Sequence, residues 1–137
     1  MMKVVLDTNV FVAAGFNSHS HAAQIIGAVR AGRLALVWNE ETRSETQHIL
    51  EKIPPLAWSD FAPLFREVDR YDGVTEPERF LEVSDPDDRK FAALALAVGA
   101  TLVTQDEHLL SVRDSLGVTV QTARGFWERM AAANLGA

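Results

Sequence analysis

The sequence predicts an α/β fold: a three-layer α/β/α sandwich whose central sheet is mainly parallel and has four to five strands. Short apolar runs rich in β-branched residues, such as Val4-Val5-Leu6, alternate with longer stretches of helical periodicity. Strands that alternate with helices pair in parallel through right-handed crossovers, and helices then cover both faces of the sheet. Residues 1–137 are expected to form one such domain, because no repeat or linker interrupts them.

The strands are expected where short apolar segments end in polar or turn-forming residues. Arg79–Val83 would be a short strand at an edge of the sheet. The five expected strands are Lys3–Asp7, Leu34–Trp38, Arg79–Val83, Thr101–Gln105 and Val118–Gln121.

Capping and breaking residues mark the ends of the expected helices. Serine, asparagine and aspartate cap helix N-termini, whereas proline and glycine end helices. Asp85-Pro86 and Gly99 delimit one helix in this way, which runs to about Val98. The other helices are expected over His21–Arg33, capped by Ser18 or Ser20; from Asn39 to about Ile53, ended by Pro54-Pro55; from Ser59 or Asp60 to about Tyr71; in a short segment before Val118; and over Phe126–Asn134.

The composition excludes several classes of protein. A chain that is 47% hydrophobic and 23% charged is typical of globular rather than disordered proteins. The absence of cysteine excludes disulfides and thiolate metal sites and favours a cytoplasmic location. No signal peptide is evident before the first expected strand, and Phe91–Val103 is shorter than the roughly 20 apolar residues that span a membrane.

The net charge of −6 bears on nucleic-acid binding. Proteins that bind nucleic acid through bulk electrostatics are usually basic. An acidic chain that binds phosphate must therefore place cations at the point of contact, and a bound metal ion would supply them.

Acidic residues recur where the fold would bring them together. Asp7 and Asp106 each end an expected strand, and ligands of open α/β sheets bind at the carboxyl ends of the strands. Asp85, Asp87 and Asp88 stand at a helix N-terminus. In the helix after Asn39, four-residue spacing places Glu45 on one face with Glu41, Ile49 and Ile53, so Glu45 is expected to align with the buried stripe.

Carboxylates gathered in one crevice repel one another unless a cation binds between them. Ligand sets made of oxygen alone favour Mg²⁺ or Mn²⁺ over zinc. Such ions suit the hydrolysis of phosphodiesters, because they activate water and stabilise the leaving oxygen. The acids therefore indicate a metal-dependent phosphodiesterase site.

Four segments in order resemble one known family. VVLDTNV, the helical Glu45, DPDDRKFAALALAVGA and LVTQDEHLL together resemble the PIN-domain ribonucleases, in particular the VapC-like toxins of type II toxin-antitoxin systems. The similarity runs from Lys3 to about Glu128. It implies an α/β/α sandwich that cleaves RNA with Mg²⁺ or Mn²⁺, often dimerises, and is commonly held inactive by a small antitoxin.

The resemblance also implies roles for particular residues. Many relatives have glycine in place of Gln105 and aspartate in place of His108, and the second difference removes an outer ligand for a second metal ion. The implied metal-binding and catalytic acids are Asp7, Glu45, Asp88 and Asp106, and the small polar residues that position ligands or water are Thr8, Asn9 and Thr104.

Two other functions remain open at the level of sequence. The first is a PIN-fold protein that has lost catalysis and acts through protein or RNA contacts, which His108 in place of an acid would favour. The second is a phosphatase or receiver-like domain, although such phosphatases usually carry a second aspartate where this chain has Asn9.

Several other side chains have two interpretations. Arg43, Arg89 and Lys90 would either contact RNA phosphates or balance acidic neighbours. His19 and His21 are more typical of an exposed loop than of a zinc site. The large aromatic residues are expected in the core or at a partner interface rather than as base-stacking platforms; they are Trp38, Trp58 and Phe65.

Overall fold

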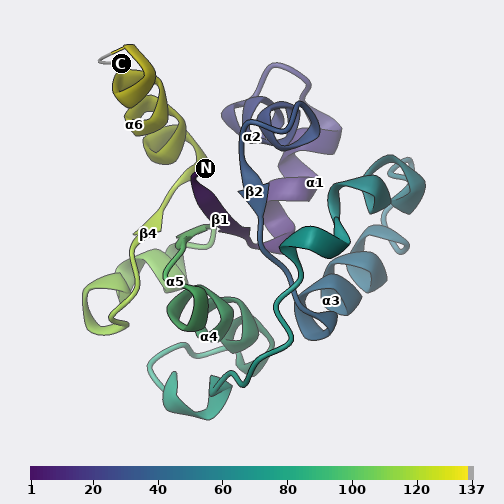
Figure 1. The fold of residues 1–137 in the computed structure, drawn as a ribbon. Coiled ribbons are helices and arrows are strands. Elements are labelled where there is room, and N and C mark those ends of the chain that lie inside the picture. The colour runs from purple at the N-terminus through teal and green to yellow at the C-terminus, as the bar shows by residue number, and fades with distance from the viewer. Residues whose placement is uncertain (136–137) are drawn as a thin grey trace.

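Four parallel strands form the central sheet in the order β2-β1-β3-β4. Figure 1 labels β1, β2 and β4. The structure is a computed structural model and describes residues 1–135. Val4 of β1 lies opposite Leu36 on one side and Thr101 on the other. This confirms the parallel sheet, with strands shorter than predicted. Their bounds are β1 (Lys3–Leu6), β2 (Ala35–Leu36), β3 (Thr101–Val103) and β4 (Val120–Gln121).

The order of the strands reverses between β1 and β3. From β1 the chain crosses to β2 on one side, and it later enters β3 on the opposite side of β1. A crevice forms at such a switch point beyond the carboxyl ends of the two strands, because their crossovers leave in opposite directions. The residues directly after Leu6 and Val103 therefore face one another.

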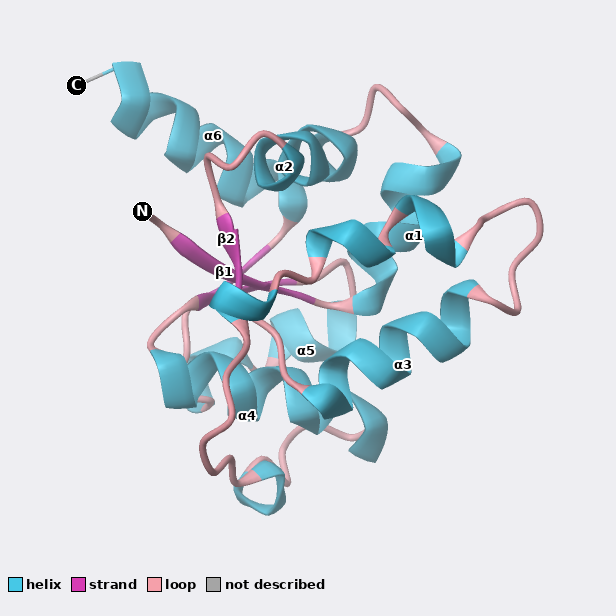
Figure 2. Ribbon diagram, turned by 45° about the vertical axis from the view of Figure 1, so that its right-hand side comes forward, coloured by secondary structure: helices cyan, strands magenta, loops and turns pink. Residues whose placement is uncertain are grey.

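Helices cover both faces of the sheet (Figures 1 and 2). On one side lie α1 (Thr8–Phe16), α2 (His21–Arg30) and α6 (Ala123–Leu135), and on the other α4 (Arg89–Val98) and α5 (Glu107–Ser111). The remaining helix, α3 (Glu40–Leu50), contacts both α1 and α4. The three-layer α/β/α arrangement is confirmed.

The central strand divides the apolar core into two parts. Val4 and Leu6 pack with Phe11 of α1 in one part, whereas Val5 packs with Phe91 of α4 in the other. This division follows from the pleat, because successive side chains of a strand point to opposite faces. The buried run in β1 is explained by a sheet that is covered on both sides.

The helix α1 was not predicted. It begins at Thr8, directly after Asp7, so no loop separates it from β1. Its β-branched Val10 and Val12 are weak helix formers, and Val10 is fully buried against the neighbouring elements. Burial of this face stabilises the helix where local propensity does not.

The helix predicted from Ser59 or Asp60 to Tyr71 is wrong. The segment forms three short 3₁₀ helices, which are η1 (Trp58–Asp60), η2 (Ala62–Leu64) and η3 (Glu67–Asp69). Pro63 lacks a backbone N–H, which disfavours a continuous α-helix. Further along, the chain pairs with Trp38 beyond the end of β2, where the Tyr71 N–H donates to the Trp38 carbonyl at 2.8 Å.

The edge strand predicted over Arg79–Val83 is also wrong. Its first residue, Arg79, ends a 3₁₀ helix, η4 (Pro77–Arg79), and the described sheet does not include the segment. Phe80 and Val83 are buried in the α4 side of the core, and the Val83 N–H donates to the Phe80 carbonyl at 3.1 Å. The apolar residues thus reflect a packed turn rather than a paired strand.

The predicted caps are confirmed at several helices. Ser20 accepts a hydrogen bond from the Ala23 N–H at 3.0 Å, and Asn39 forms a capping box with Thr42. Gly99 ends α4 with φ of 67°, a conformation that favours glycine. A 3₁₀ helix, η5 (Pro86–Asp88), precedes α4. No helix within residues 1–135 is long and apolar enough to cross a membrane.

Candidate functional site

Asp7 lies between β1 and α1, and its side chain is buried, with only 4% of the residue exposed. Its Oδ2 accepts hydrogen bonds from the Thr104 hydroxyl at 2.8 Å and from Asn9 Nδ2 at 3.3 Å. Burial disfavours the charged form and raises the pKa of Asp7 to about 6, because these hydrogen bonds offset it only in part. A carboxyl group at the end of the central strand is thus held with a perturbed pKa.

A set of hydrogen bonds joins the segments that follow β1 and β3. The Thr104 hydroxyl accepts from the Asp106 N–H at 3.0 Å, and Asn9 Oδ1 accepts from the Gln105 N–H at 3.0 Å. Asp106 Oδ1 accepts in turn from the His108 N–H at 2.8 Å, which caps α5. Residues predicted to position ligands therefore fix the backbone around the acids.

Asp88 completes a group of three acids. It is the N-cap residue of α4 and is half-buried. Its pKa is raised to about 7, first by burial and then by the negative charge of Asp7, a hydrogen bond with Asp106 and the charges of Asp85 and Asp106. The fold therefore brings Asp7, Asp88 and Asp106 together, and we call these three residues the aspartate cluster.

Glu45 lies on α3, where the predicted buried stripe is wrong by one residue. The residues that α3 buries are Thr42, Thr46 and Leu50, so Glu45 is at the margin of the stripe. Its Oε2 is 3.5 Å from the Lys90 Nζ. The structure thus gives Glu45 a cationic partner on α4.

Thr8 connects α1 with α3. Its hydroxyl oxygen is 2.9 Å from that of Thr46, and both side chains are buried. Thr46 was not predicted from the sequence, although its four-residue spacing from Thr42 and Leu50 was a usable signal. Thr8 therefore positions a neighbouring helix in addition to following Asp7.

The three basic residues proposed as RNA contacts differ in their surroundings. The Arg43 guanidinium lies over the rings of Trp38 and Trp58, at 5.9 and 5.4 Å from their centroids. Arg89 Nε donates to the Val83 carbonyl at 2.9 Å. Lys90 pairs with Glu45, which agrees with its interpretation as a charge that balances an acid.

The aromatic residues form a packed cluster. The ring centroid of Phe65 is 5.9 Å from that of Trp38 and 5.3 Å from that of Trp58. Trp38 is buried, and the other two are partly buried against the α1 side of the core. This placement agrees with the expected core role.

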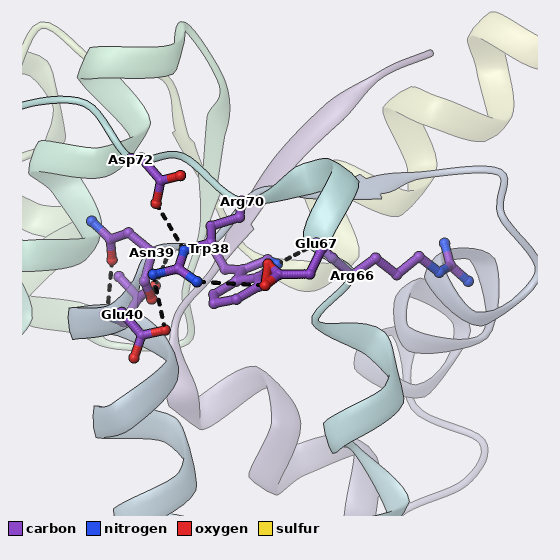
Figure 3. Close-up of polar contacts among 8 residues, drawn as sticks. Trp38, Asn39, Glu40, Arg66, Glu67, Arg70 and Asp72 are labelled. Atoms are coloured by element: carbon purple, nitrogen blue, oxygen red, sulfur yellow. Dashed lines mark hydrogen bonds and ion pairs between the residues drawn. The ribbon is translucent and has the colours of Figure 1, made fainter.

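A second group of acids surrounds Arg70, which was not predicted from the sequence (Figure 3). Its guanidinium is 2.8 Å from Asp72, 3.4 Å from Glu40 and 3.5 Å from Glu67, and lies over the Trp38 ring at 5.4 Å. Partial desolvation opposes the charged form of Arg70, but the three carboxylates outweigh it and raise its pKa. We call this group the Arg70 cluster.

The donor atoms of the aspartate cluster suit a hard divalent cation. All are carboxylate oxygens, which Mg²⁺ and Mn²⁺ prefer, and the ion pairs of residues 1–135 give none of the three acids a cationic partner. In the described part of the chain, no three acidic or histidine side chains are already arranged to hold a metal ion. The residues fit the ion in their donor chemistry, and binding requires the carboxyl groups to move closer together.

Comparisons with known proteins support the same fold. The solved structure of VapBC2 from Rickettsia felis, bound to a DNA fragment from their promoter, matches with a TM-score of 0.61 at 18% identity, covering 88% of this chain and 98% of that one. VapBC-1 from nontypeable Haemophilus influenzae matches with a TM-score of 0.59 at 18% identity, covering 90% and 99%. PAE2754 from Pyrobaculum aerophilum matches with a TM-score of 0.57 at 19% identity, covering 96% and 98%.

No curated protein sequence matches the chain. A family model described as the PIN domain matches residues 3–108, a range that contains β1, β3 and all three members of the aspartate cluster. The match covers most of the chain, and the topology and the solved structures agree with it. The chain therefore belongs to the PIN-domain family.

Proposed function

We propose that this chain is a metal-dependent endoribonuclease that hydrolyses RNA phosphodiester bonds, and that it is the toxin of a toxin-antitoxin pair. The observation that carries the proposal is the convergence of Asp7, Asp88 and Asp106, two of them with raised pKa values, at the switch point of the sheet. Perturbed carboxyl groups in such a crevice are typical of catalytic sites.

Mg²⁺ or Mn²⁺ would be held by Asp7, Asp88 and Asp106. When bound, such an ion lowers the pKa of water, orients a phosphate and stabilises the leaving oxygen. The cluster has the excess negative charge that makes binding of a dication favourable.

Neighbouring residues prepare the carboxylates for this role. Thr104 and Asn9 hold Oδ2 of Asp7, which fixes the orientation of the carboxyl group. The His108 N–H holds Oδ1 of Asp106 in the same way. Fixed ligands reduce the reorganisation that binding requires.

The raised pKa values of Asp7 and Asp88 mean that the metal-free cluster carries a proton, which it must lose when a metal ion binds. Near neutral pH Asp88 keeps a proton in part, and its hydrogen bond with Asp106 is one place for that proton. Metal ligands bind in their deprotonated form, so this proton leaves when the cation enters. At metal concentrations below saturation, activity should therefore rise with pH through about 7, because deprotonation of Asp88 favours binding of the ion.

The proposal includes a protein partner. Two of the similar solved structures are of VapBC proteins, and the VapC-like resemblance implies a small antitoxin and often a homodimer. We expect a reading frame for a small antitoxin next to this one, and co-expression of its product should suppress cleavage. Cleavage that persists with that product bound would contradict the toxin role and leave the chemistry unaffected. In this proposal the protein acts in the cytoplasm.

The central test is cleavage of a single-stranded RNA by the purified chain with Mn²⁺. Asp7→Asn should lower the rate about a thousandfold, because it weakens binding of a cation that contributes several kcal/mol to transition-state stabilisation. Circular dichroism checks that the variant is folded. Asp87→Asn removes an exposed acid next to Asp88 and should leave the rate unchanged.

Full activity of folded Asp7→Asn would contradict the mechanism. RNA binding without cleavage at millimolar Mn²⁺ would instead favour the second candidate, a PIN-fold protein that acts through contacts alone. That candidate draws on His108, which is exposed and stands where many relatives have an acid.

A further inference from the structure

A groove of about 700 Å³ lies between α3 and the start of α4. Glu41 and Glu45 line its α3 side, and Pro86 and Lys90 line the opposite side. Pro86 and Lys90 each lie two residues from Asp88 in the chain, so the segment that carries Asp88 also contributes to the groove.

The direction of Glu45 follows from the helix that carries it. Thr46 faces Thr8, which directly follows Asp7. Successive residues of an α-helix are rotated by about 100°, so Glu45 points to the side of that contact rather than into it. It meets Lys90 across the groove at 3.5 Å, and each side chain is 23% exposed.

The charges around Glu45 in the groove therefore differ from those around Asp88 in the aspartate cluster. Glu45 has its counter-ion within the protein, whereas Asp88 has acidic neighbours in Asp7, Asp85 and Asp106. A carboxylate already paired with an ammonium group has less need of a metal ion than one among other carboxylates.

We propose that Glu45 is a positioning residue that holds Lys90, and that Lys90 binds a phosphate of the RNA in this groove. This inference rests on the proposed function and assigns Glu45 a role other than metal ligand. An ammonium group has three donors, and one contact with Glu45 leaves others for phosphate oxygens.

Because the groove is acidic, RNA can bind there only if a positively charged side chain is fixed in position to contact a phosphate. Its other carboxylates would repel RNA, and Glu40 among them is already paired with Arg70. Arg43 is stacked on tryptophan rings and Arg89 is bonded to the Val83 carbonyl, which leaves Lys90 to face the groove. A phosphate that enters beside α4 therefore meets Lys90.

The first experiment measures Mn²⁺ binding to the full chain by calorimetry. Glu45→Gln should bind Mn²⁺ within about fivefold of the unaltered chain, as expected for loss of a partly exposed ion pair. Glu41→Gln is the matched control, because it removes one acid from the same groove and helix. A loss of more than about tenfold in Glu45→Gln alone would show that Glu45 supports the metal ion, directly or through a ligand, and would overturn the inference.

The second experiment measures RNA binding by fluorescence anisotropy in EDTA, where metal-dependent cleavage cannot occur. Lys90→Met should weaken binding of a labelled single-stranded RNA and reduce the salt slope by about 0.7, the value for one phosphate contact. Lys90→Arg should restore both, and Lys52→Met, at an exposed residue just beyond α3, should change neither. Equal effects of Lys90→Met and Lys52→Met would overturn the inference.

A double-variant cycle tests whether Glu45 acts through Lys90. Glu45→Gln should weaken RNA binding although it removes a negative charge, whereas Glu41→Gln should strengthen it slightly. With Lys90→Met present, Glu45→Gln should behave like Glu41→Gln. An unchanged effect of Glu45→Gln in that background would contradict the positioning role. If the unaltered chain binds no Mn²⁺ at all, the proposed function fails, and this inference fails with it.

Discussion

The aspartate cluster and the Arg70 cluster each contain three carboxyl groups, but only the second contains a cation. Around Arg70, the guanidinium lies within 3.5 Å of Glu40, Glu67 and Asp72 (Figure 3). In the aspartate cluster, burial and mutual repulsion raise the pKa values of Asp7 and Asp88 to about 6 and about 7. One group of acids is neutralised by the protein itself, and the other is not.

The positions of the two clusters explain this difference. The Arg70 cluster fastens the segment after η3 to Trp38 and the start of α3, outside the sheet edge formed by β2. The aspartate cluster lies at the switch point between β1 and β3, where ligands of such sheets bind. We therefore interpret the first as a structural device and the second as a site that a ligand completes.

The largest expected difference between the two clusters is that a metal ion bound at the aspartate cluster stabilises the fold. At a Mn²⁺ concentration about 100 times the dissociation constant, the free energy of unfolding should rise by about 2.7 kcal/mol, because only the folded chain binds the ion. Urea denaturation with and without Mn²⁺ measures this rise. Asp88→Asn should remove most of it and Asp87→Asn should keep it, and an equal loss in both variants would contradict a specific role for Asp88.

The metal-free protein should lose stability as pH rises. The folded pKa values of Asp7 and Asp88 exceed their ordinary value of 3.8, so their contribution is complete below about pH 4 and is lost as pH rises through about 6 and 7. Between pH 6 and pH 8 in EDTA, the free energy of unfolding should fall by about 1 kcal/mol, allowing for the partial exposure of Asp88.

Asp7→Asn should reduce this dependence on pH, because it removes one of the two groups. Urea denaturation at several pH values makes the comparison. If the metal-free chain is more stable at pH 8 than at pH 6, deprotonation of the cluster does not destabilise the fold, which would contradict this prediction.

The smallest effect is expected for the removal of the Arg70 cation. Arg70→Met keeps an apolar side chain against Trp38 but leaves three acids without their cation, so the melting temperature should fall by a small but measurable amount. Arg79→Met, which removes a single exposed ion pair with Glu76, should have less effect. Mn²⁺ affinity should stay unchanged in both. A loss of Mn²⁺ binding in Arg70→Met alone would mean that the two clusters are coupled.

Much of the sheet was predictable because its signals are local. The buried run of β1, the caps at Ser20 and Asn39 and the glycine at Gly99 each depend on neighbouring residues, and the structure confirms them. The helix α1 and the turn at Phe80 were not predictable in this way. Their apolar residues are stabilised by distant contacts, which override local propensity.

The candidate site was predictable in part for a similar reason. Asp7 and Asp106 each follow a strand, so the topology alone brings them to one edge. The partner of Glu45 was not predictable, because the buried stripe of α3 is formed by Thr42, Thr46 and Leu50 and polar residues hide it in the sequence. The Arg70 cluster joins residues from separate segments that no periodicity connects.

The most direct test of the unneutralised aspartate cluster is the number of protons released when Mn²⁺ binds. Calorimetric titrations at pH 6 in buffers of different ionisation enthalpy give this number. With pKa values of about 6 and about 7, Asp7 and Asp88 should release about one proton per ion, and fewer at pH 8. Binding without proton release at pH 6, or no binding at millimolar Mn²⁺, would contradict the account.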